Sequence, residues 1–163
     1  MRQRTAAVAV VAGVVAFGIT ATAVATPPSG FSGTTISVGR FDEIDVKTKE
    51  QLPHQVKIKT QGESDVYVVQ NTVQSGGHSG WHTHPGPSLI TVVQGTATLY
   101  DADDPTCTPH VVEAGDGTID VGDGHVHLLK NEGDEVLISV AVQFLPAGAP
   151  RRIDAPDPGN CDL

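Results

Sequence analysis

Two short segments rich in histidine and glycine decide the fold of this chain. Residues 76–88 have the sequence GGHSGWHTHPGPS, and residues 122–131 have the sequence GDGHVHLLKN. Residues two apart in a β-strand point to the same face, so His82 and His84 project together. A strand from the second segment can bring His127 to meet them. Because converging neutral imidazoles suit zinc, copper, iron or nickel, the two segments together predict one metal site.

The spacing of these residues resembles the two motifs of the cupins, small antiparallel β-barrels with a metal at the centre. The first motif is matched by Gly76, His82, His84 and Gly95. The second is matched by Gly124, His127 and Asn131, whereas Gly122 stands where the family has proline. The resemblance covers roughly residues 65–146. It implies an all-β fold, a single jelly-roll-like antiparallel β-barrel, and a divalent transition metal: iron, zinc, manganese, nickel or copper.

The remaining sequence agrees with an all-β fold. Short runs of β-forming residues alternate with turns of Gly, Asp and Pro, and no amphipathic helix of useful length stands out. Residues 55–59 alternate apolar and charged side chains, which predicts a half-buried strand. Residues 42–52 fit either a strand or a helical turn. The other expected strands are residues 34–38, 65–73, 89–93, 96–100, 110–113, 118–121, 125–130 and 136–145.

One position departs from the family pattern. The family's metal-binding glutamate should lie six residues before Gly95, and that residue is Ser88. A neutral hydroxyl is a poor substitute for a carboxylate on a divalent cation. His125 is a candidate replacement ligand if its strand is regular, or else it lies at the barrel mouth or in solvent. Trp81 points away from the ligands and either packs in the core or forms a wall of the mouth.

The ends of the chain predict export. Residues 1–25 combine an arginine-containing start, an apolar run and an Ala-x-Ala sequence, which is typical of a cleaved signal peptide. A transmembrane anchor is the rival interpretation, although the apolar run is short for a bilayer. We therefore expect a secreted protein in four parts: a signal peptide at 1–25, a flexible lead-in at 26–33, the barrel at 34–146 and a C-terminal tail at 147–163.

The charge limits the partners that the protein can have. Without Arg2 and Arg4 the mature chain has eight basic and 19 acidic residues, a net charge of −11. Such a chain repels phosphate backbones, so no nucleic acid partner is expected. After signal cleavage no stable membrane association is expected either. The expected partner is a small-molecule ligand, and a homodimer stays open.

Two cysteines, Cys107 and Cys161, lie outside both histidine motifs. An even count in a secreted chain predicts a disulfide, which would attach the tail to the barrel. Two free thiols are the alternative.

Three functions remain open at this point. The chain is a metal-dependent enzyme of the oxygenase type acting on a small organic molecule, a non-catalytic module that binds a ligand or metal, or a structural cupin with a degenerate site. No other catalytic motif occurs in the sequence. Catalysis therefore depends on whether a metal is bound, and no catalytic residue is assigned beyond the expected metal ligands.

Overall fold

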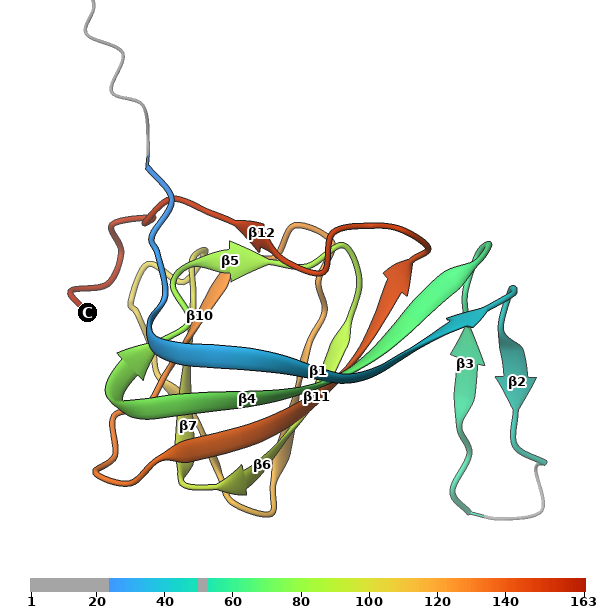
Figure 1. Ribbon diagram of the computed structural model, residues 1–163, viewed down its shortest axis with the longest axis horizontal. Coiled ribbons are helices and arrows are strands. Elements are labelled where there is room, and N and C mark those ends of the chain that lie inside the picture. The colour runs from blue at the N-terminus through green and yellow to red at the C-terminus, as the bar shows by residue number, and fades with distance from the viewer. Residues whose placement is uncertain (1–23, 50–52) are drawn as a thin grey trace, which may run out of the picture.

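The protein is an antiparallel β-barrel. The computed structural model describes residues 24–49 and 53–163, and these contain strands and turns but no helix. Ten of the strands form one sheet that curls into two packed halves (Figure 1). One half has the order β1–β4–β11–β6–β9 and the other has the order β12–β5–β10–β7–β8, with β10 also touching β4. The all-β, jelly-roll prediction is confirmed.

The first half of the barrel has the longer strands. It contains β1 (Ser29–Phe41), β4 (Ser64–His78), β6 (Ser88–Gln94), β9 (Gly117–Asp120) and β11 (Leu137–Pro146). The second half contains β5 (His82–Thr83), β7 (Thr96–Asp101), β8 (His110–Glu113), β10 (His127–Lys130) and β12 (Ile153–Asp154). A separate hairpin, β2 (Asp45–Lys47) with β3 (Lys57–Lys59), stands away from the barrel in Figure 1.

Strand β11 shows how the sequence produces this barrel. Its residues alternate between buried and partly buried along most of its length, as expected when one face of a strand covers a core. It pairs with β4 on one side and β6 on the other, so its backbone groups are satisfied on both edges. Its inward side chain Leu137 packs with apolar residues of both halves, namely Val73, Val92, Ala97, Leu99, Val112 and Leu129.

Two expectations about the early part of the chain are wrong. Residues 29–33, expected in a flexible lead-in, are the beginning of β1, which pairs with β4 along its whole length. Strand pairing needs only backbone groups, so the Gly and Ser residues there do not prevent it. Residues 57–59 form β3, but this strand is mostly exposed because it pairs only with β2. Residues 45–47 resolve the ambiguous segment as a strand, while 50–52 lie outside the described residues.

The departure from the family pattern at Gly122 has a steric cause. Gly122 has φ +67°, which proline cannot adopt because its ring fixes φ near −65°. A Cβ atom at this position would also collide with the carbonyl oxygen of Gly86. The turn before β10 therefore passes too close to the residue 86 backbone for any side chain at position 122.

The motif residue Asn131 has a structural role. Its side chain is fully buried, and its Nδ2 donates to the carbonyls of Val73 and Glu135 at 2.9 and 2.8 Å. Its Oδ1 accepts a hydrogen bond from the Gly133 N–H at 3.0 Å. Asn131 thus joins β4 to the turn between β10 and β11.

The C-terminal tail is part of the fold. Cys107 and Cys161 form a disulfide, as predicted, at a sequence separation of 54. β12 pairs with β5, and Ala25 forms a bridge with Pro156. The predicted signal segment lies outside the described residues apart from positions 24 and 25. Within the described residues, no helix is long and apolar enough to cross a membrane.

An ion pair between β1 and β4 holds the start of the C-terminal tail in place. Asp65 on β4 is buried and accepts two hydrogen bonds from Arg40 on β1, at 2.7 and 2.8 Å. It also accepts a hydrogen bond from the Gly148 N–H at 2.8 Å. These interactions hold the pKa of the Asp65 carboxyl down at about 2, with the Arg40 hydrogen bond as the largest cause. The turn that leads from β11 into the tail is therefore attached to β4.

Candidate metal centre

Three histidines meet inside the barrel as the spacing predicts. His82 lies on β5, directly opposite His127 on β10, and His84 follows β5. All three are buried, and their ring centroids are 4.4 to 5.5 Å apart. One nitrogen of each ring lies within 4.8 Å of those of the other two. Because paired residues on neighbouring strands have Cβ atoms only about 5 Å apart, the His82–His127 pairing alone brings two rings together.

The backbone determines which ring nitrogens face the centre. The Nδ1 of His82 lies 2.9 Å from the Gly80 carbonyl oxygen, and the Nδ1 of His84 lies 2.6 Å from the Arg151 carbonyl oxygen. A carbonyl only accepts, so each Nδ1 carries the hydrogen and donates it. The Nε2 atoms then keep free lone pairs, which is the tautomer that a metal ligand requires.

The third histidine lies beside a carboxylate. The Nδ1 of His127 lies 3.5 Å from Oδ1 of Asp120, a buried residue at the end of β9. The two groups make no hydrogen bond, and the His127 Nδ1 has no other partner among the described residues. No sequence motif pointed to Asp120, because only the pairing of β9 with β6 brings it beside the histidines.

Burial keeps the three rings neutral. It is the largest cause that lowers the pKa of His82 to about 2 and that of His127 to about 4. It also lowers the pKa of His84 below its usual value. Neighbouring histidines lower the pKa values of His82 and His127 further, whereas Asp120 acts in the opposite direction on those of His84 and His127. Neutral imidazoles can bind a cation without first losing a proton at pH 7.

Ser88 faces the histidines from the opposite half of the barrel. It is buried on β6 and pairs in register with Gln143 on β11. The Gln143 Nε2 donates to Ser88 Oγ at 3.0 Å, and its Oε1 accepts from Arg151 Nη1 at 3.2 Å. Arg151 only donates, which fixes the orientation of the Gln143 amide. The serine, which stands at the motif's glutamate position in the sequence, therefore lines the same cavity as the histidines but carries no charge.

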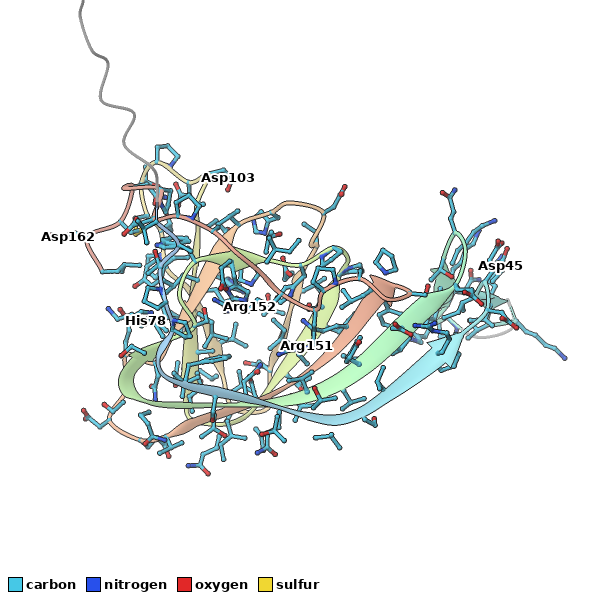
Figure 2. All side chains as sticks on the ribbon, turned by 45° about the horizontal axis from the view of Figure 1, so that its top comes forward. Asp45, His78, Asp103, Arg151, Arg152 and Asp162 are labelled. Atoms are coloured by element: carbon cyan, nitrogen blue, oxygen red, sulfur yellow. A yellow bond between two sulfur atoms is a disulfide. The ribbon has the colours of Figure 1, made fainter. Side chains whose placement is uncertain are left out.

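A small cavity lies between these groups. Its volume is about 40 Å³, and the three histidines, Ser88 and Gln143 are among the residues that line it. One water needs roughly 10–15 Å³, so the cavity holds only a few atoms. Two arginines of the tail, Arg151 and Arg152, also line it (Figure 2, where both lie inside the outline of the barrel).

The two arginines differ in their partners. Arg152 forms an ion pair with Asp154 at 2.6 Å and donates to the Ser79 carbonyl. Arg151 is half-buried, burial lowers the pKa of its guanidinium, and no carboxylate of the described residues lies within ion-pairing distance of it. The sequence showed only an Arg-Arg pair in a tail, and the pairing of β12 with β5 is what brings it to the cavity.

His125 lies outside the three-histidine group. β10 begins at His127, so the regular strand that would align the two side chains does not exist there. His125 is half-buried in the preceding turn, with its Nδ1 3.3 Å from Asp120 and its Nε2 3.4 Å from Asp101. Trp81 packs in the core with Tyr100, Leu128 and Ala155, in agreement with the first of its two interpretations.

Comparison with known proteins identifies the class. Residues 69–143 match the family model described as the cupin domain. Among solved structures, the polyketide cyclase RemF from Streptomyces resistomycificus has 14% identity and a TM-score of 0.51, with 83% of this chain and 80% of that chain covered. This likeness is one of fold. Together with the barrel and the motif histidines, the family match makes this part of the chain a cupin domain.

Two further structures are similar to this chain. An uncharacterized protein with a double-stranded beta-helix domain from Klebsiella pneumoniae has 25% identity and a TM-score of 0.47, with 70% of this chain and 84% of that chain covered. An oxalate decarboxylase from Lactobacillus farciminis has 25% identity and a TM-score of 0.47 over 55% of this chain, which spans only 26% of that enzyme. No curated protein matches the sequence significantly.

Proposed function

We propose that this protein binds a divalent transition metal through Nε2 of His82, His84 and His127 and uses that metal to bind a small anionic molecule. The observation that carries the proposal is the convergence of three buried, neutral imidazoles. In two of them, His82 and His84, a backbone carbonyl accepts a hydrogen bond from Nδ1. The three imidazoles line one small cavity, and nitrogens gathered there would otherwise need other polar partners. Iron, zinc, manganese, nickel and copper all accept such ligands.

The charges around the cavity favour an anion. The three imidazoles are neutral, and Ser88 replaces the carboxylate that would compensate a metal cation. Arg151 adds a positive charge that no acidic side chain of the described residues pairs with. A half-buried arginine without a counter-ion is costly, and a metal cation bound beside Arg151 would add repulsion between the two positive charges. A bound carboxylate would compensate both charges.

The size of the cavity limits the ligand. About 40 Å³ admits a molecule of a few heavy atoms, such as a one- or two-carbon carboxylate, without movement of the barrel. Three protein ligands leave coordination positions free, which suits two donor atoms of one ligand. A small hydroxy acid therefore fits the site better than a catechol does.

We propose an enzymatic role of the oxygenase type for this centre. A bound iron with three histidine ligands supplies oxygen activation at the positions left free. The chain's own residues bind and orient the ligand: Arg151 pairs with its carboxylate, and Gln143 holds both Arg151 and Ser88 in place. The apolar lining from Ile90 and Leu129 excludes bulk water from the cavity.

The experiment that tests this function compares anions with neutral molecules. Titration calorimetry on the metal-loaded protein should show binding of glycolate, whereas glycolamide, its neutral analogue, should bind at least tenfold more weakly. Arg151→Gln should weaken glycolate binding by about tenfold to a hundredfold, the effect of losing one charge-assisted contact. Lys59→Gln is the control, since Lys59 is an exposed cation on β3, away from the barrel. Equal binding of both molecules would contradict the anion proposal.

A second variant, Ser88→Glu, puts a carboxylate of the protein in the place of the bound anion. Ser88→Glu should tighten metal binding at least tenfold, because it restores a carboxylate beside the cation. The same side chain should fill the small cavity and pair with Arg151, so glycolate binding should be lost. Competition with a metal chelator measures the first effect, and Ser88→Gln separates charge from size. If Ser88→Glu and Ser88→Gln had the same metal affinity, the carboxylate would not reach the metal.

We also propose that the protein works outside the cytoplasm. The Cys107–Cys161 disulfide supports this, because such bonds persist in oxidising compartments. The signal-like segment at residues 1–25 supports it independently. Expression of the full chain with its own leader, followed by mass measurement of the exported protein, tests cleavage after Ala25. A mature protein that still carries residues 1–25 would favour the membrane anchor.

A further inference from the structure

A second cavity lies on the other side of His127 from the three-histidine centre. Its volume is about 110 Å³, and the residues that line it include Asp101, His110, Asp120, His125 and His127. Nothing in the proposed function uses these groups except His127. His127 therefore lines both cavities, and its Nδ1 lies 3.5 Å from Oδ1 of Asp120, which lines the second one.

Buried polar atoms at this place lack partners. In the described part of the chain, only three buried side-chain nitrogen or oxygen atoms make no hydrogen bond, and two of them are Asp120 Oδ2 and His127 Nδ1. The Asp120 side chain is 2% exposed and that of His127 is 4% exposed. An unpaired buried polar atom is unfavourable, so one on each of these two neighbouring side chains indicates a missing partner beside Asp120 and His127.

The distances fit a cation at this place. Asp120 Oδ1 lies 3.3 Å from His125 Nδ1 and 3.5 Å from His127 Nδ1. Ligand atoms about 2.0–2.1 Å from a tetrahedral metal lie about 3.4 Å from one another. The three ligand atoms lie within 4.8 Å of one another, and the His125 and His127 rings are nearly parallel with centroids 6.0 Å apart.

An ion pair does not explain these atoms. A protonated His125 between Asp120 and Asp101 would use both of its nitrogens, at 3.3 and 3.4 Å. It would still leave Asp120 Oδ2 and His127 Nδ1 without partners. A cation contacts Asp120 and both histidines at once, and Asp101 at the cavity adds a further negative charge.

We propose that Asp120, His125 and Nδ1 of His127 bind a second divalent transition metal, so that the imidazole of His127 bridges two metals. The second metal site does not depend on the three-histidine centre. Only the bridge between two metals does, and the bridge therefore rests on the proposed function. The Nδ1 hydrogen of His127 leaves to solvent when the second cation binds. The two sites then differ in character: the first has three neutral ligands and the second includes a carboxylate.

Metal stoichiometry tests the proposal. The metal-free protein titrated with Zn²⁺ should bind two equivalents, as should the control variant His54→Ala. His125→Ala and His84→Ala should each bind one, and the double variant should bind none. Asp120→Asn, which keeps the side-chain shape, should lose the second equivalent while thermal unfolding shows a folded chain. One equivalent in wild type, lost in His84→Ala and retained in His125→Ala, would overturn the second site alone.

The same titration separates this proposal from the first site. If the wild-type chain bound one equivalent that His125→Ala lost and His84→Ala kept, the three-histidine centre would be wrong and the second site right. Loading with Cu²⁺ tests the bridge itself, because a shared imidazole couples two unpaired spins. The electron paramagnetic resonance intensity should fall well below two spins per chain in wild type and equal one in His125→Ala. Two fully independent spins in wild type would overturn the bridge.

Discussion

Replacing His84 by alanine should remove one equivalent of metal from the purified protein. His84 is buried, and its Nδ1–H donates to the Arg151 carbonyl, so its Nε2 is the nitrogen that would bind the metal and alanine supplies no ligand in its place. Loss of a residue that only orients a ligand costs about 10–100-fold in metal affinity, and loss of the ligand itself should cost more than that. Elemental analysis after native purification, together with chelator competition, measures the change.

The matched control is another histidine far from the centre. His54 is exposed and lies outside the three-histidine group, so His54→Ala should keep the full metal content. His82→Ala should behave like His84→Ala, because His82 and His84 are both held by backbone carbonyls. An unchanged metal content in His84→Ala, or a loss of metal in His54→Ala, would show that the three-histidine group is not a metal site.

Replacing both cysteines by serine should give the largest loss of stability. The disulfide closes a loop of 54 residues in sequence, for which the chain-entropy relation gives about 4 kcal/mol. The half-buried Cys107 and Cys161 also pack against the cluster that contains Trp81 and Tyr100. We expect the melting temperature of the double variant to fall by more than about 10 °C, measured by calorimetry.

The metal site should also respond to the loss of the disulfide. The tail supplies the Arg151 carbonyl that orients His84, and β12 that pairs with β5. A loosened tail should therefore weaken metal binding by roughly tenfold, in the range seen when an orienting group is lost. Wild-type protein treated with a reductant is the control, because it breaks the same bond without a substitution. An unchanged melting temperature in both samples would mean that the tail is held by other contacts alone.

The motif spacing correctly predicted the barrel and the convergence of the three histidines because both depend on local rules. Side chains two apart share a face of a strand, so His82 and His84 had to lie together once residues 82–83 were extended. The motif glycines and Asn131 mark turns whose backbone angles or hydrogen bonds few other residues satisfy. These constraints act within a few residues and can be recognised in a sequence.

Expectations that depended on strand regularity or composition were less reliable. His125 was expected to share a face with His127 if the strand were regular, but β10 begins only at His127. Residues 29–33 have a loop-like composition and are nevertheless a strand, because β4 offers them unpaired backbone groups along its edge. Pairing with a distant strand overrides weak local preference.

The sequence by itself determined the fold class, the three histidines and the disulfide partners, because motif spacing and the count of two cysteines left few alternatives. Only the tertiary structure decided what surrounds the histidines. Asp120 reaches His127 through the pairing of β9 with β6, and Arg151 reaches the cavity through the pairing of β12 with β5. Both contacts join residues whose relation depends on how the sheet closes, and closure is a property of the whole barrel that no single segment encodes.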